Sequence, residues 1–213
     1  NDHYVYFAGI GIFLIIASSV SSKFLSKKIL IMLYVFFALY FVTLGYLSYQ
    51  RIHDFRDSIT VWTDVIKKYP GCSVAYNNRG AAYNDLGMND DAISDISRAI
   101  KIKPNYTEAL FNRANLYQSR GAHYLAIADY NKAIRSRPNY VEAYNNRGNS
   151  YLAIGFYDEA FADFTKALEI MPGFARAYNN RGLVYQAQGQ YDKELEDYHQ
   201  AIELMPDYVK ALR

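Results

Sequence analysis

Asparagine recurs at a fixed spacing through most of the chain. The sequence AYNNRG occupies residues 75–80, 143–148 and 177–182, and a diverged copy, ALFNRA, occupies residues 109–114. The second asparagine therefore returns with a 34-residue period, at Asn78, Asn112, Asn146 and Asn180. A carboxamide both donates and accepts hydrogen bonds, so a column of them can bind the backbone of an extended polypeptide whatever its sequence. We predict that this column contacts a bound peptide.

Further asparagines would enlarge the predicted binding surface. They flank the column at Asn77, Asn145 and Asn179, and they follow it at Asn115 and Asn149. The resulting surface would be polar and largely uncharged. In the alternative interpretation these side chains cap or solvate helices and bind nothing, because duplication of a repeat copies its surface residues together with its core.

Arginine and aspartate recur with the same period. The arginines are Arg79, Arg113, Arg147 and Arg181, and the aspartates that follow each of them at the same distance are Asp95, Asp129, Asp163 and Asp197. This joint recurrence of opposite charges predicts salt bridges, within a repeat or to the next one, that satisfy partly buried guanidinium groups. Alternatively, the arginines reach into a groove and bind an anionic ligand.

Other kinds of site find little support in the sequence. The four histidines are scattered without metal-ligand spacing, and Cys72 is the only cysteine, so we predict no metal, no cofactor and no catalytic constellation. With 23 basic and 21 acidic residues, the chain lacks the strong positive charge that is typical of nucleic-acid binders. Binding of a protein partner is therefore the favoured function.

The recurring side chains must be positioned by repeated elements. Units align without a gap at 73–106, 107–140, 141–174 and 175–208, and a fifth begins at 209–213. Each unit carries aromatic or apolar residues at helical spacing, then a glycine (Gly87, Gly121, Gly155 and Gly189), then a second apolar series, then a proline (Pro104, Pro138, Pro172 and Pro206). Glycine in the left-handed conformation ends a helix, and proline disfavours helix in the residue before it. We predict an all-α solenoid of antiparallel helix pairs, each buried by its neighbours.

In period, glycine, small-residue and proline positions, residues 73–208 resemble the tetratricopeptide repeat (TPR) family. The resemblance implies a right-handed superhelix whose first helices line a concave groove, where the asparagine column is similar to the one in the repeats of O-linked N-acetylglucosamine transferase. It argues against the carboxylate-clamp subclass, which binds acidic C-termini through a lysine where this chain has Asn77. The resemblance therefore implies a scaffold that binds an extended polypeptide or protein partner.

The N-terminal 50 residues have a different composition. Residues 4–20 and 29–49 contain no charged side chain and are close to the ~20 residues that a helix needs to cross a bilayer. We predict a transmembrane hairpin over residues 1–50, with a buried apolar hairpin in a soluble protein as the alternative. Lys23, Lys27 and Lys28 crowd the turn between the spans, which favours a cytoplasmic turn and an exoplasmic array, periplasmic or lumenal. Because the chain begins without methionine and stops inside a repeat, we expect it to be part of a longer integral membrane protein.

The junction at residues 51–72 is predicted to be half a repeat. Ser58, Trp62, Val65 and Pro70 stand where the second helix of a unit has its small, large, small and proline residues. The order of parts is two spans, then this junction, then TPR units. This order resembles the C-terminal part of polytopic (GT-C type) glycosyltransferases that use a polyprenyl-phosphate sugar, including the transmembrane and TPR O-mannosyltransferases. That resemblance implies an alternative function, the recruitment of acceptor polypeptide to an enzyme, and carries over no catalytic residue.

Overall fold

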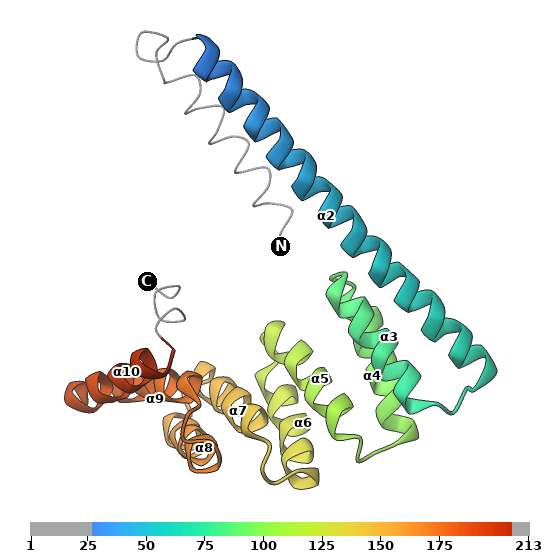
Figure 1. Cartoon of the computed structure of the whole chain (residues 1–213). Coiled ribbons are helices and arrows are strands. Elements are labelled where there is room, and N and C mark those ends of the chain that lie inside the picture. The colour runs from blue at the N-terminus through green and yellow to red at the C-terminus, as the bar shows by residue number, and fades with distance from the viewer. Residues whose placement is uncertain (1–26, 206–213) are drawn as a thin grey trace. The chain divides into compact units, whose positions relative to one another are not determined.

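The computed structural model describes residues 27–205, apart from the side chains of residues 27, 29, 30, 48 and 51–57. Every regular element in this range is an α-helix (Figure 1). The helices are α2 (Lys27–Lys68), α3 (Ser73–Asp85), α4 (Asn89–Ile102), α5 (Thr107–Ser119), α6 (His123–Ser136), α7 (Val141–Ala153), α8 (Tyr157–Ile170), α9 (Ala175–Ala187) and α10 (Tyr191–Leu204). The prediction of an all-α solenoid of helix pairs is confirmed for the described residues from 73 to 205.

Each first helix ends two residues before the predicted glycine. Gly87 has φ 74°, and the other three unit glycines have φ between 71° and 81°. The N–H of Met88 donates to the carbonyl of Tyr83 at 2.8 Å, and that of Gly87 donates to Asn84 at 2.9 Å, which satisfies carbonyls that the helix end would leave unpaired. The same pair of hydrogen bonds recurs after α5, α7 and α9.

Each second helix ends two residues before the predicted proline. Lys103, which precedes Pro104, has φ −130° and ψ 91°, the extended conformation that the proline ring imposes on its predecessor. The N–H of Lys103 still donates to the carbonyl of Ala99, so the last turn is closed. Local backbone chemistry thus sets the boundaries of both helices in a unit.

Small and large side chains alternate where the two helices of a unit meet. Ala92, Ala126 and Ala160 are fully buried, and so are the large side chains of Tyr130 and Phe164. One core cluster joins residues of α5, α6 and α7 (Ala114, Ala126, Tyr130, Ile134 and Ala143). The apolar face of a unit is therefore covered in part by the next unit, as expected for a stacked array.

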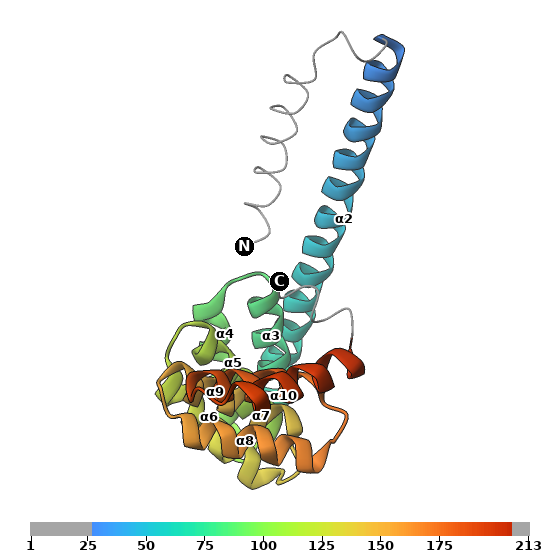
Figure 2. The same cartoon turned by 90° about the vertical axis from the view of Figure 1, so that its left-hand side faces the viewer.

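The first helices form the inner layer of the array. Among the described helices, α3, α5, α7 and α9 contact one another in turn, whereas no second helix contacts the second helix of the next pair. Figures 1 and 2 show the pairs following one another along a curved path from α3 to α10. Side chains on the exposed face of the first helices are thereby brought side by side.

The chain divides into two compact parts, each much longer than a repeat: residues 1–53 and 54–213. The first predicted span, residues 4–20, and the fifth repeat, 209–213, lie outside the described residues. The second predicted span falls within α2, where large apolar side chains from Ile31 to Tyr49 are exposed. Within the part of the chain that the structure describes, no helix combines the length and the apolar character needed to cross a membrane. The transmembrane hairpin is therefore not shown.

Candidate binding surface

The predicted asparagine column lies on the inner layer, one residue from each of α3, α5, α7 and α9. The structure shows that three of these side chains, those of Asn112, Asn146 and Asn180, donate hydrogen bonds to other asparagines of the preceding repeat. Nδ2 of Asn112 donates to Oδ1 of Asn77 at 3.1 Å, and Nδ2 of Asn180 donates to Oδ1 of Asn145 at 2.9 Å. These bonds join α5 to α3 and α9 to α7.

The bonds form an amide network in two segments. The longer segment runs in one direction, each side chain donating to the next: Asn179, Asn180, Asn145, Asn146 and Asn115. The shorter segment runs in the same sense through Asn112, Asn77 and Asn78. Oδ1 of Asn115 also accepts a hydrogen bond of 2.6 Å from the hydroxyl of Tyr130, whose pKa is raised by burial. The network holds successive first helices together, a role that the sequence did not predict.

The amide network restricts which asparagines can contact a ligand. Asn77 and Asn145 are only 6% and 4% exposed, and both use donor and acceptor inside the protein. Among the predicted asparagines, the groups without a partner in the described residues are Nδ2 of Asn78, Oδ1 of Asn112, Nδ2 of Asn115, the whole amide of Asn149 and Oδ1 of Asn179. Some amide groups of the predicted surface thus serve the structure of the array, and the others are available to bind a ligand.

Phe111 separates the two segments of the amide network. It occupies the unit position that holds Asn77, Asn145 and Asn179 elsewhere. Its ring lies 4.8 Å from the ring of Tyr140 and 5.9 Å from that of Tyr130, measured between centroids. Because phenylalanine carries no amide, Asn112 receives no donor there, and Asn146 bonds to Asn115 instead.

Each recurring arginine is paired with the aspartate of its own unit. Nε of Arg79 lies 2.6 Å from Oδ2 of Asp95, and its Nη2 lies 2.9 Å from Oδ1, a bidentate arrangement. The same two bonds join Arg113 to Asp129, Arg147 to Asp163 and Arg181 to Asp197. The four aspartates are 3% to 8% exposed, so the pairs lock the first helix to the second within the repeat.

A third bond from three of these arginines reaches the preceding second helix. Nη1 of Arg79 donates to the hydroxyl of Thr63 at 3.0 Å, and Nη1 of Arg113 donates to that of Ser97 at 2.9 Å. Nη1 of Arg147 donates to Oδ1 of Asn131 in the same way. Thr63 belongs to α2, so the C-terminal part of α2 is hydrogen-bonded to α3 through the same arginine position that joins α5 to α4.

The surroundings of the arginines keep them charged and inside the array. Hydrogen bonds to Asp95 and Asp197 raise the pKa of the Arg79 and Arg181 guanidinium groups. For Arg147, burial is the largest single influence and opposes the charge, but the hydrogen bonds and the negative charge of Asp163, with smaller contributions from two tyrosines, together outweigh it, so its pKa is also raised. Tyrosine rings flank these groups, with Arg79 5.7 Å from the ring centroid of Tyr76. A structural salt bridge accounts for this geometry, and no arginine of this set is left for an anionic ligand.

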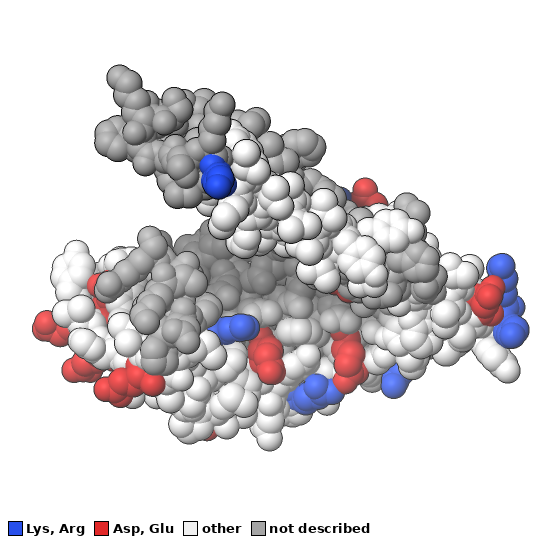
Figure 3. Space-filling view, turned by 45° about the horizontal axis from the view of Figure 1, so that its top comes forward, with Lys and Arg blue, Asp and Glu red and all other residues white. Residues whose placement is uncertain are grey.

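Charges on the rest of the array are of both signs. Figure 3 shows acidic side chains gathered toward the left-hand end of the visible face, and acidic and basic side chains interspersed over the rest of it. The inner layer itself contributes few charges, among which is the exposed Asp85 at the end of α3. This surface favours a partner that is recognised through hydrogen bonds more than through overall charge.

Three tetratricopeptide repeat models match the sequence, at residues 73–106, 115–155 and 139–207. Together they cover more than half of the chain. No curated protein sequence gives a significant match. The resemblance of residues 51–70 to membrane glycosyltransferases gains no support from these matches.

Several solved structures have a similar fold. A crystal structure of MamA is 27% identical with a TM-score of 0.68, over 74% of this chain and 92% of that one. The 41-end fragment of MamA from Desulfovibrio magneticus RS-1 is 15% identical with a TM-score of 0.67, over 72% and 86%, a likeness of fold alone. The first TPR of Spaghetti (RPAP3), bound to the HSP90 peptide SRMEEVD, is 26% identical with a TM-score of 0.54, over 55% and 93%.

Proposed function

Because the chain belongs to the tetratricopeptide repeat family, we propose that it is a scaffold that binds an extended polypeptide along the inner layer of α3, α5, α7 and α9. The observation that carries the proposal is the row of amide groups on this layer that have no partner among the described residues, from Asn78 to Asn179. They include donors and acceptors, as a peptide backbone does. The similar RPAP3 structure is bound to a peptide, which supports peptide binding as a function of this fold.

The proposed ligand differs in charge from the acidic peptide of that similar structure. The TPR resemblance places the clamp lysine at Asn77, which is 6% exposed and engaged in the amide network. A cation at this position is therefore missing from the inner layer. We expect backbone hydrogen bonds, rather than a terminal carboxylate, to supply most of the affinity.

Peptide binding is tested by replacing an available amide. Asn149→Ala removes a half-buried carboxamide that makes no bond to another described residue, so the fold loses nothing. We expect the affinity for bound peptides to fall roughly fivefold, the equivalent of one ordinary hydrogen bond. The measurement is fluorescence anisotropy with labelled peptides selected from an array of unstructured 15-residue sequences.

The matched control is Asn105→Ala, which removes an exposed amide from the turn between two units. It should leave peptide affinity unchanged. An array on which no peptide binds above background, or an equal loss in both variants, would contradict binding along the inner layer.

We also propose that the predicted hairpin over residues 1–50 anchors the array at a membrane, with the array on the exoplasmic side. Support comes from the uncharged stretch 29–49 and from its exposed side chains, including Phe36 at 63% and Leu39 at 61%. Large exposed apolar surfaces are rare in soluble monomers. The enzymatic alternative, acceptor recruitment by a glycosyltransferase, has no observation in its favour among the described residues.

Membrane anchoring predicts resistance to alkaline carbonate extraction. The chain should remain in the membrane pellet, and Phe36→Lys with Leu39→Lys should move it to the soluble fraction, because each lysine costs ~2.5–3.5 kcal/mol within a bilayer. Protease added to sealed vesicles of known orientation reports the side of the array. Recovery of the unsubstituted chain in the soluble fraction would refute the anchor.

A further inference from the structure

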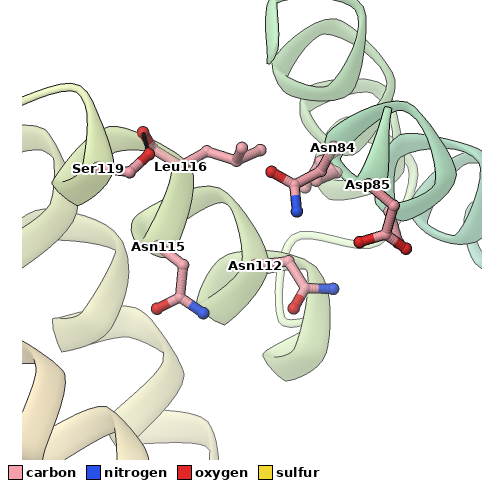
Figure 4. A pocket seen from close by; sticks show the side chains of 8 residues that line it. Asn84, Asp85, Asn112, Asn115, Leu116 and Ser119 are labelled. Atoms are coloured by element: carbon pink, nitrogen blue, oxygen red, sulfur yellow. Dashed lines mark hydrogen bonds between the residues drawn. The ribbon is translucent and has the colours of Figure 1, made fainter. Parts of the chain in front are cut away.

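A pocket opens on the inner layer where α3 and α5 face each other. Its volume is about 310 Å³, at the lower end of the ~300–1,000 Å³ typical of small-molecule sites, so it suits one side chain better than a whole ligand. Figure 4 shows Asn84 and Asp85 on the α3 side, across the opening from Asn112 and Asn115 of α5. The pocket lies wholly within the repeat array.

The floor of the pocket is apolar. Leu116 and Ile96 line it and are 4% and 1% exposed, so both are held in place by the core behind them. The aliphatic part of a long side chain placed against them would be buried from water without disturbing any polar group. The pocket thus combines an apolar base with polar groups at its rim.

The polar rim coincides with the gap in the amide network. Because Phe111 interrupts the network, Oδ1 of Asn112 has no donor among the described residues, and Nδ2 of Asn115 has no acceptor among them either. Asp85 adds a carboxylate for which the described residues provide no ion pair. Two residues with unpaired acceptors, one of them charged, therefore line the same small pocket.

The position of Asp85 is unfavourable for its own helix. It is the last residue of α3, where the helix dipole disfavours negative charge, and α3 has no basic residue in that turn. The equivalent residues of the other units are Ser119, Ala153 and Ala187, so only the first unit bears an acid there. A charge that does not help the fold and occurs once in the array is suited to selecting a ligand.

We propose that this pocket receives a lysine or arginine side chain of the extended peptide bound on the inner layer. The cationic group lies between the Asp85 carboxylate and Oδ1 of Asn112, and the stem lies against Leu116 and Ile96. Nδ2 of Asn115 then donates to a carbonyl of the peptide backbone. The proposal rests on the proposed function and adds to it a basic residue that fixes the register of the peptide.

The test uses one host peptide that binds the array, with a single residue varied among lysine, arginine, glutamine, leucine and glutamate. Anisotropy titrations against the full chain should give lysine and arginine the highest affinity, about fivefold above glutamine, with glutamate the weakest. The lysine preference should shrink as salt is raised, because the pair is near solvent.

Asp85→Asn should abolish the preference for lysine over glutamine while leaving the affinity for the glutamine peptide unchanged. The control, Asp91→Asn, removes an exposed acid of α4 outside the pocket and should leave the preference intact. Equal affinities for all five peptides, a preference for glutamine or leucine, or a lysine preference that survives Asp85→Asn would overturn the pocket proposal. Failure of every host peptide to bind would instead refute the proposed function.

Discussion

Asp129→Ala is expected to lower the free energy of unfolding of the array by about 3–5 kcal/mol. The Asp129 side chain is 4% exposed and its partner Arg113 is 16% exposed, so the substitution leaves a buried guanidinium without its carboxylate. The bond from Arg113 to Ser97 remains but carries no compensating charge. Urea denaturation followed by circular dichroism measures the change.

A double substitution distinguishes the loss of the charge pair from the loss of the side-chain volume that the pair occupies. Replacing Arg113 and Asp129 together by leucine removes both charges, and buried ion pairs exchanged for apolar groups usually cost little. The double variant should therefore recover most of the stability lost in Asp129→Ala. Asp91→Ala, at an exposed acid, should stay within ~0.5 kcal/mol of the parent. A loss in Asp129→Ala no larger than this control would show that the pair does not stabilise the fold.

Gly148→Ala is expected to destabilise the array by about 1–3 kcal/mol. A Cβ at this position would lie 2.7 Å from Cε1 of Phe164, and the Phe164 ring is fully buried and has no room to move. Helix propensity alone predicts the opposite sign, a gain of ~1 kcal/mol for alanine over glycine within a helix. The sign of the change in the urea midpoint therefore decides between overpacking and propensity.

Gly182→Ala provides the comparison within the same chain. Its Cβ would lie 2.6 Å from Cε1 of Tyr198, but that ring is half-buried and can shift toward solvent. The loss should be smaller than for Gly148→Ala. A gain in stability for both variants would mean that the close approach of the paired helices is not required.

The sequence predicts the helix pairs because their determinants are local. Gly87 ends a helix and Pro104 ends the next through the backbone of a few neighbouring residues. The salt bridges were also predictable, since Arg79 and Asp95 recur together and opposite charges must be paired when buried.

The amide network could not be predicted in the same way. The bond from Asn112 to Asn77 joins neighbouring repeats, and it depends on how closely the curvature of the array brings two first helices together. The identity of Phe111 was visible as a departure from the repeat, but its effect on Asn112 and Asn115 follows only from that geometry. Recurrence indicates which positions matter, and the packing of repeats decides what each one does.

The third hydrogen bond of the arginines determines the order in which the helix pairs of the array unfold. Arg79, Arg113 and Arg147 each donate a hydrogen bond to the helix that precedes their own pair, α2, α4 and α6 respectively. Three successive junctions are therefore stabilised by such a bond. At the α8–α9 junction the corresponding residue is Thr165, whose Oγ1 is buried without a partner among the described residues. Under a pulling force, or in spontaneous local unfolding, the α9–α10 pair should therefore unfold first, while the pairs that have the third arginine bond remain folded.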